Sequence, residues 1–112
     1  MYKYYIEVLR VLDGDTVDAM VDLGFKIWTK KRIRFVGIDA PETRTRNLEE
    51  KARGIICKNR VIELLEKNDM KAELICHGIG KYGRVLGALR VKSERDTIND
   101  ILVLEGLATT YE

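Results

Sequence analysis

The first third of the chain contains three runs rich in apolar, β-branched and aromatic residues, separated by short segments of turn-forming residues. The runs cover residues 5–12, 16–22 and 26–38. In the second run, polar and apolar residues roughly alternate, which is the period of a strand with one buried face. Asp13-Gly14 and residues 23–25 are typical of tight turns. The pattern therefore predicts three consecutive strands joined as a β-meander.

The spacing changes after these strands. Pro41, the only proline, lacks an amide donor and restricts the residue before it, so the third strand should end near Asp39. A polar residue within 43–47 is expected to cap the helix that follows. From Leu48 to Lys67 the residues in a helical spacing of three to four are Leu48, Ala52, Ile55, Ile56, Asn59, Ile62 and Leu65 or Glu66.

Two more strands and a second helix complete the predicted elements. The strands are expected at residues 70–77 and from 82 to about 91, joined by a loop at 78–80. A short helix should then run from Thr97 or Ile98 to Glu105. The order is therefore β-β-β-α-β-β-α.

Five short strands with a helix between the third and the fourth is the order of an OB-fold barrel. The 112 residues are enough for one domain with a modest core, and 46% hydrophobic and 34% charged residues are an ordinary globular mixture. We therefore expect a mainly β fold with helices, a five-stranded OB-fold barrel, as a single domain over residues 1–112.

The net charge of +2 is too small to indicate nucleic-acid binding, so any positive field must be local. Basic residues cluster at 26–34 and at 44–53, although such clusters are usually solvated faces. Cys57 and Cys76 lack the paired spacing of a zinc site. They are expected to be two buried thiols, and a single bridge between them is the alternative.

No apolar run approaches the length of a membrane span, so no membrane association is expected. The start of the chain lacks the long apolar stretch and the small-residue cleavage site of a signal peptide. If Met1 is native, we expect a cytoplasmic protein. If Met1 was added to a mature secreted chain, that expectation fails.

Three polar segments interrupt the strands and carry the candidate chemistry. They are Asp13-Gly14-Asp15-Thr16, then Arg34 with Asp39-Ala40-Pro41-Glu42-Thr43, and Lys81-Tyr82-Gly83-Arg84. Carboxylates bind hard divalent cations and arginines hold phosphates, so the combination indicates phosphodiester chemistry. Each segment alone also has a plainer explanation as a turn or a helix start, which for the first segment is the more common one.

The positions of the charged residues make a structural prediction. Asp13 and Asp15 are two residues apart, so an extended chain would place both carboxylates on one face. Arg34 and Asp39 are five apart, so strict alternation would place them on opposite faces. For both to serve one site the backbone must bend or bulge, and Gly37 is the expected place.

The third segment offers groups suited to a nucleotide. Arg84 can make a bidentate contact to a phosphate, Tyr82 can stack on a base, and Gly83 allows close approach of a ligand. A turn with a surface arginine is the alternative. His77, the only histidine, is expected to be a surface or loop residue rather than a catalyst.

Taken together, the segments resemble those of the staphylococcal nuclease (thermonuclease) family from about Val8 to Tyr111. The family fold is an OB-barrel, which agrees with the predicted order of elements. The matching motifs, in order, are Asp-Gly-Asp-Thr-Val at 13–17, Arg34, Asp-Ala-Pro-Glu-Thr at 39–43, Lys-Tyr-Gly-Arg at 81–84 and Glu-Gly-Leu-Ala at 105–108.

This resemblance implies a Ca²⁺ site. Asp15 and Asp39 would be its direct carboxylate ligands, and the backbone carbonyl of Ala40 would be a third ligand. Asp13 would act from the outer shell through water. Glu42 matches the carboxylate proposed as general base in the family.

The resemblance also implies how the substrate is held. Arg34 and Arg84 match the two phosphate-binding arginines, and Tyr82, Tyr111 and Lys81 would contact the nucleotide. The expected activity is Ca²⁺-dependent hydrolysis of DNA and RNA with little sequence preference, leaving 3′-phosphate ends. The alternatives are a non-catalytic OB module that binds nucleic acid or protein, and a small fold with a structural cation site.

Three departures from the family pattern are visible. Gly80 stands where many members have aspartate, and the stretch between Thr43 and the helix is shorter than in the type member. The sequence ends soon after Tyr111, without the C-terminal helix of the type member, so the expectation is either a less stable barrel or a partner subunit that covers the exposed face.

Overall fold

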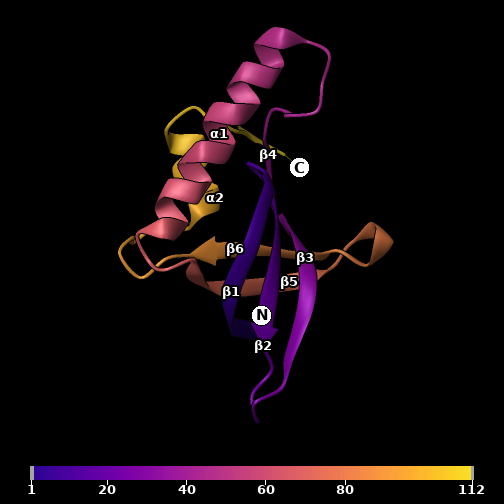
Figure 1. Cartoon of the computed structure of the whole chain (residues 1–112), viewed down its shortest axis with the longest axis vertical. Helices are drawn as coiled ribbons and strands as arrows, with labels where there is room; N and C mark the ends of the chain where they lie inside the picture. The colour runs from indigo at the N-terminus through magenta and orange to yellow at the C-terminus, as the bar shows by residue number, and fades with distance from the viewer. Residues whose placement is uncertain (1, 112) are drawn as a thin grey trace.

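The computed structural model describes residues 2–111, so Met1, on which the expectation about localisation rests, lies outside the described residues. Five strands form a closed barrel in the order β1-β2-β3-β6-β5 (Figure 1). Neighbouring strands are antiparallel except β3 and β6, which are parallel, and β5 closes the barrel against β1. The OB-type barrel is therefore confirmed. The strands are β1 (Tyr2–Asp13), β2 (Thr16–Asp22), β3 (Trp28–Phe35), β5 (Lys71–Ile79) and β6 (Val85–Arg90).

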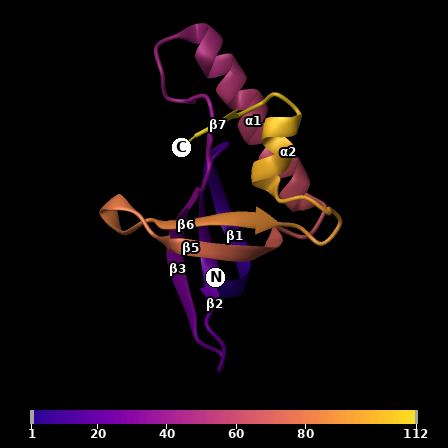
Figure 2. The same cartoon turned by 180° about the vertical axis from the view of Figure 1, so that it is seen from behind.

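Both helices lie at one end of the barrel, and the turn between β2 and β3 lies at the other (Figures 1 and 2). They are α1 (Leu48–Glu66) and α2 (Ile98–Leu104), within two residues of their predicted limits. The side chain of Asn47 accepts hydrogen bonds from two amides in the first turn of α1, and Thr97 caps α2 in the same way.

The core fills the barrel and continues between the barrel and the helices. On β3, the side chains of Ile33 and Phe35 are buried while those of Arg32 and Arg34 lie on the outer side. This alternation is what places charged groups on the face of the barrel that carries the site. The largest fully buried side chains are Phe35, Ile6, Ile33, Leu64, Leu65, Leu74, Leu89, Ile98, Leu102, Val17, Val61 and Val91.

The third strand is shorter than predicted. It ends at Phe35, and Gly37 takes a φ of +80°, a conformation that glycine adopts at little cost. The chain then re-enters a strand as β4 (Ile38–Asp39), which pairs with the unpredicted β7 (Thr109–Thr110). The bend predicted at Gly37 is confirmed, and it explains why one continuous strand over 26–38 was wrong.

Other strand limits also differ from the prediction. The first strand begins at Tyr2 rather than near residue 5, and β5 continues through the expected loop at Gly78 to Ile79 with a register shift after Cys76. The last barrel strand begins only at Val85, because residues Lys81–Gly83 form a 3₁₀ turn. That turn projects from the side of the barrel (Figure 1).

Most of the residues whose spacing predicted α1 are not buried, and among them only Leu65 lies on the buried face. Leu48, Ile55 and Ile56 are exposed. The buried face instead consists of Gly54, Cys57, Val61, Leu64 and Leu65. Small residues on this face let the helix approach the backbone closely, and a hydrophobic-spacing rule does not register them.

The two cysteines and the single histidine were also assigned environments from the sequence. Cys57 is buried and Cys76 is half-buried, and both are free thiols, so no bridge joins them. His77 is exposed on β5, as expected for a surface residue. Within residues 2–111, no helix has the length and apolar character that a membrane span requires.

Candidate active site

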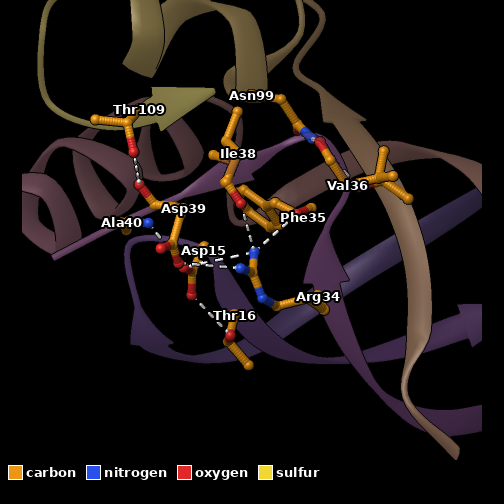
Figure 3. Close-up of polar contacts among 11 residues, drawn as sticks. Asp15, Thr16, Arg34, Phe35, Val36, Ile38, Asp39, Ala40, Asn99 and Thr109 are labelled. Atoms are coloured by element: carbon orange, nitrogen blue, oxygen red, sulfur yellow. Dashed lines mark hydrogen bonds and ion pairs between the residues drawn. The ribbon is translucent and has the colours of Figure 1, made fainter. Parts of the chain in front are cut away.

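Arg34 joins the two carboxylates that the sequence placed in one site (Figure 3). Its Nη1 atom lies 3.4 Å from Oδ2 of Asp15, and its Nη2 atom lies 3.3 Å from Oδ1 of Asp39. The side chains of Arg34 and Asp15 are largely buried, whereas that of Asp39 is 60% exposed. Two carboxylates from segments 24 positions apart therefore converge on one cationic group at the end of the barrel.

The bend around Gly37 is fixed by hydrogen bonds from both sides. Nη1 of Arg34 donates to the carbonyl oxygens of Phe35 and Ile38, at 2.8 and 2.9 Å. The amide of Tyr111 donates to the carbonyl of Gly37 at 2.8 Å. These bonds hold the chain in the conformation that turns Asp39 back toward Arg34.

Asn99 supports the same bend from helix α2 and was not identified from the sequence. Its buried side chain donates to the carbonyls of Val36 and Gly87 and accepts from the amide of Leu89. Figure 3 shows Asn99 reaching Val36 from above the bend. One asparagine among helical residues has no pattern of its own, so only the folded structure reveals this role.

The first acidic turn is tied to the second acidic segment at two points. Oδ2 of Asp15 accepts the amide of Ala40 at 2.9 Å, and Oδ1 accepts the hydroxyl of Thr16 at 3.0 Å. Asp13 accepts hydrogen bonds from both the amide and the hydroxyl of Thr43. The two aspartates therefore reach opposite ends of the same short segment.

Helix α1 packs closely against both acidic segments, at contacts where one partner is glycine. A Cβ atom added to Gly54 would lie 2.6 Å from the carbonyl oxygen of Glu42, so the helix touches this segment directly. A Cβ atom added to Gly14 would lie 2.3 Å from Sγ of Cys57. Burial, and secondarily Asp15 and Asp13, raise the pKa of the Cys57 thiol to about 11, so this thiol stays protonated at neutral pH.

Replacing Gly54 with alanine should displace Glu42 and lower kcat for the phosphodiester hydrolysis that the family resemblance implies. The new methyl group would overlap the backbone of Pro41 and Glu42, so the segment or the helix must move. A displacement of about 1 Å at a catalytic group can cost roughly a hundredfold in rate. Lys51→Ala, an exposed change on the same helix, is the control in the kinetic assay. A Gly54→Ala variant with unchanged kcat would show that this packing does not position Glu42.

Glu42 itself is exposed, and its amide donates to Oε2 of Glu50 at 3.2 Å. The described contacts therefore fix its backbone and leave the carboxylate in solvent, where it can reach a water or a substrate. This is consistent with a proton acceptor, the role that the family resemblance implied.

The third segment lies beside β3 on the outer face of the barrel. Residue pairs Ile33–Val85 and Arg34–Leu86 align β3 with β6, so Arg84 lies in register with Arg32, two pairs away from Arg34. Within residues 2–111, the Nε atom of Arg84 is buried and has no hydrogen-bond partner. Both predicted phosphate-binding arginines therefore lie on one face of the barrel.

The predicted nucleotide-contacting residues lie at the edge of this region. Tyr82 is 94% exposed and adopts a φ of +63° within the 3₁₀ turn, and Lys81 beside it is also exposed. Tyr111 is exposed next to the short β4–β7 sheet. These side chains are free for a ligand but are not brought into contact with the carboxylates.

Asp18 and Arg32 form a further pair on the same face. Nε and Nη2 of Arg32 donate to the two carboxylate oxygens of Asp18, at 2.8 and 3.2 Å. The Asp18 side chain is buried, and its hydrogen bonds to Arg32 lower its pKa below the usual 3.8, outweighing the opposite effect of burial. No pattern in the sequence indicated this pair.

The pair should make stability depend on pH. Because the pKa of Asp18 is lower in the folded chain than in the unfolded chain, its contribution is present above about pH 4 and disappears as the pH falls through the folded-state value. Asp18→Asn should therefore lower the free energy of unfolding at pH 7 and matter progressively less below about pH 4. Urea unfolding over this pH range measures the difference. An equal difference at pH 7 and pH 3 would contradict the assignment, and Asp96→Asn, an exposed change, is the control.

The donor set is suited to a hard cation, although the protein side chains alone do not complete a site. Asp15 and Asp39 both present carboxylate oxygens near the guanidinium of Arg34. Oxygen is the ligand atom that Ca²⁺ prefers. No group of three or more histidine, cysteine or acidic side chains close enough to hold a metal occurs within residues 2–111. Carbonyl oxygens, water and substrate would have to supply the other ligands.

Comparison of the sequence with known proteins identifies related nuclease sequences. A family model described as "Staphylococcal nuclease homologue" matches residues 32–112. The chain is 30% identical over 112 residues to a micrococcal nuclease of Shigella flexneri, covering 94% of this chain and 57% of the relative. It is 33% identical over 116 residues to Protein ParB of Escherichia coli, covering 94% and 56%. The chain thus spans little more than half the length of these relatives. Since the family model matches most of the sequence, the chain belongs to the staphylococcal nuclease homologue family.

Proposed function

We propose that this chain is a Ca²⁺-dependent nuclease that hydrolyses phosphodiester bonds in DNA and RNA with little sequence preference. The observation that carries the proposal is the convergence of Asp15, Arg34 and Asp39 at one end of the barrel. Support also comes from membership of a nuclease family and from the second arginine, Arg84, on the same face.

In this proposal the acidic residues hold the cation. Asp15 and Asp39 would contribute carboxylate oxygens and Ala40 a carbonyl oxygen, while Asp13 would act through water. When bound, such an ion places positive charge beside the phosphate and makes water more acidic. Fixing the acids in advance matters, and the hydrogen bonds of Asp15 to Ala40 and of Asp13 to Thr43 do this.

The chain's other residues would act on water and phosphate. Glu42 accepts a proton from the attacking water, whose oxygen forms a bond to phosphorus. The bond from phosphorus to the 5′ oxygen breaks, which leaves a 3′-phosphate end, and the leaving oxygen takes a proton from solvent.

The two arginines would stabilise the charge on the phosphoryl oxygens. Nη1 of Arg34 is already held by two carbonyl oxygens, so Nη2, which contacts the exposed Asp39, is the donor that we assign to phosphate. Arg84, directly before β6, supplies a guanidinium whose buried Nε has no hydrogen-bond partner within residues 2–111.

A nuclease assay with and without the ion tests the proposal. Single-stranded DNA and RNA should be cleaved in Ca²⁺ and remain intact with a calcium chelator. Equal cleavage in both conditions, or none in either, would count against it. Binding in Ca²⁺ without cleavage would favour the non-catalytic OB module. A rise in Tm with Ca²⁺ but no hydrolysis would favour a structural cation site.

A further inference from the structure

A shallow hollow of about 390 Å³ lies on the barrel face beside the candidate active site. It is lined by four cationic side chains, Lys30, Lys31, Arg32 and Arg84, and by one carboxylate, that of Asp18. Such an excess of one sign at a concave place attracts an anion much more strongly than the small net charge of the chain would suggest.

The strand geometry makes this hollow a continuation of the site. Lys30, Arg32 and Arg34 occupy alternate positions on β3, so their side chains leave the strand on the same side. Alternate positions are about 6.6 Å apart, a step similar to the spacing of successive phosphates in a single strand. A polynucleotide with one phosphate at Arg34 and Arg84 would therefore bring its neighbouring phosphate over Arg32 and Lys30.

The Arg32 guanidinium is preorganised for a contact with phosphate. Its pair with Asp18 uses Nε and Nη2 and fixes the plane of the guanidinium, while the side chain stays 51% exposed. Nη1 takes no part in that pair and is the atom available to a ligand. The buried, unpartnered Nε of Arg84 beside it likewise requires an acceptor that the described residues do not provide.

We propose that Lys30, Lys31 and Arg32 form a second phosphate-binding site on a single polynucleotide strand, which holds the phosphate next to the scissile one at Arg34 and Arg84. Tyr82, which also lines the hollow and is 94% exposed, is placed to stack on an unpaired base there. The inference rests on the proposed function for its substrate class, and it predicts that a polymer is bound more tightly than a single phosphodiester.

The test is binding of a labelled single-stranded oligodeoxynucleotide, followed by fluorescence anisotropy in a calcium chelator so that no cleavage is needed. Lys30→Gln with Lys31→Gln should weaken binding and reduce the dependence of log K on log salt concentration by about 0.7, since loss of the one phosphate contact at this site removes about 0.7. Between 50 and 200 mM salt this corresponds to about 2.6-fold less loss of affinity.

Two matched variants separate the site from general charge effects. Lys71→Gln with Lys92→Gln removes the same charge from exposed lysines that line a different hollow, and it should leave the salt dependence unchanged. Asp18→Asn with Arg32→Gln removes the Asp18–Arg32 ion pair without changing net charge, and it should still weaken binding. Thermal unfolding by circular dichroism establishes that each variant is folded, and the exposed lysine pair keeps the test informative if the Asp18–Arg32 pair is needed for folding.

The two proposals fail in different ways. Equal effects of the two lysine pairs, or no binding by the wild-type chain, would overturn the second phosphate site whatever the nuclease assay shows. If Ca²⁺ gives no hydrolysis but the lysine pair at 30 and 31 weakens binding more than the control pair, the proposed hydrolysis is wrong and the binding site stands.

Discussion

Replacing Arg84 with alanine should lower kcat for nucleic-acid hydrolysis by about two to three orders of magnitude. Arg84 is one of two guanidinium groups assigned to the phosphoryl oxygens, and charge on these oxygens is stabilised most when the donor is fixed in advance. Its Nε has no hydrogen-bond partner within the described chain, so its removal leaves no protein group newly unpaired. The free energy of unfolding should change by less than about 1 kcal/mol.

The kinetic comparison has a control on the strand that follows Arg84. Arg90→Ala removes an arginine at the other end of β6, 3.9 Å from Glu73, and should leave kcat unchanged. Arg84→Lys should recover only part of the rate, because an ammonium group cannot reproduce a bidentate contact. Wild-type kcat for Arg84→Ala in a steady-state assay would remove this residue from the mechanism.

Replacing Asp39 with asparagine should raise the Ca²⁺ concentration needed for half-maximal activity by about a hundredfold or more. Removing a partner outside the first coordination shell already costs tenfold to a hundredfold in metal affinity, so a direct ligand should cost at least as much. Asp39 is 60% exposed and its ion pair with Arg34 is therefore worth little to stability. The change should act on the ion rather than on the fold.

The measurement is initial rate against Ca²⁺ concentration for both proteins. Asp96→Asn, an exposed change of the same kind, should give the wild-type curve. A curve for Asp39→Asn that overlaps the wild-type curve would show that Asp39 does not ligate the ion.

The order of elements along the chain, the two helices and the bend at Gly37 could be predicted because each depends on local information. The bend followed from parity alone, since Arg34 and Asp39 cannot share a face of a regular strand. The short β4 and β7 could not be predicted, because two residues are too few to show a period and their pairing joins positions 70 apart. The single domain over the whole chain and the partner subunit remain predictions.

The residues of the candidate site were predicted, but the residues that hold them in place were not. The family resemblance indicated Asp15, Arg34 and Asp39, and the structure brings these three together. Gly54 and Asn99 were missed, because a glycine on a helix face and one buried amide matter only through what the folded chain packs against them. The helical spacing likewise marked exposed apolar residues, since it does not count the small buried ones.

The most direct test of the account is a crystal structure of this chain with Ca²⁺ and a nucleoside 3′,5′-bisphosphate. We expect one ion bound by carboxylate oxygens of Asp15 and Asp39, and one phosphate bound by the guanidinium groups of Arg34 and Arg84. A structure in which the ion or the phosphate binds elsewhere, while Arg34 keeps its contacts to both aspartates, would contradict the proposed active site.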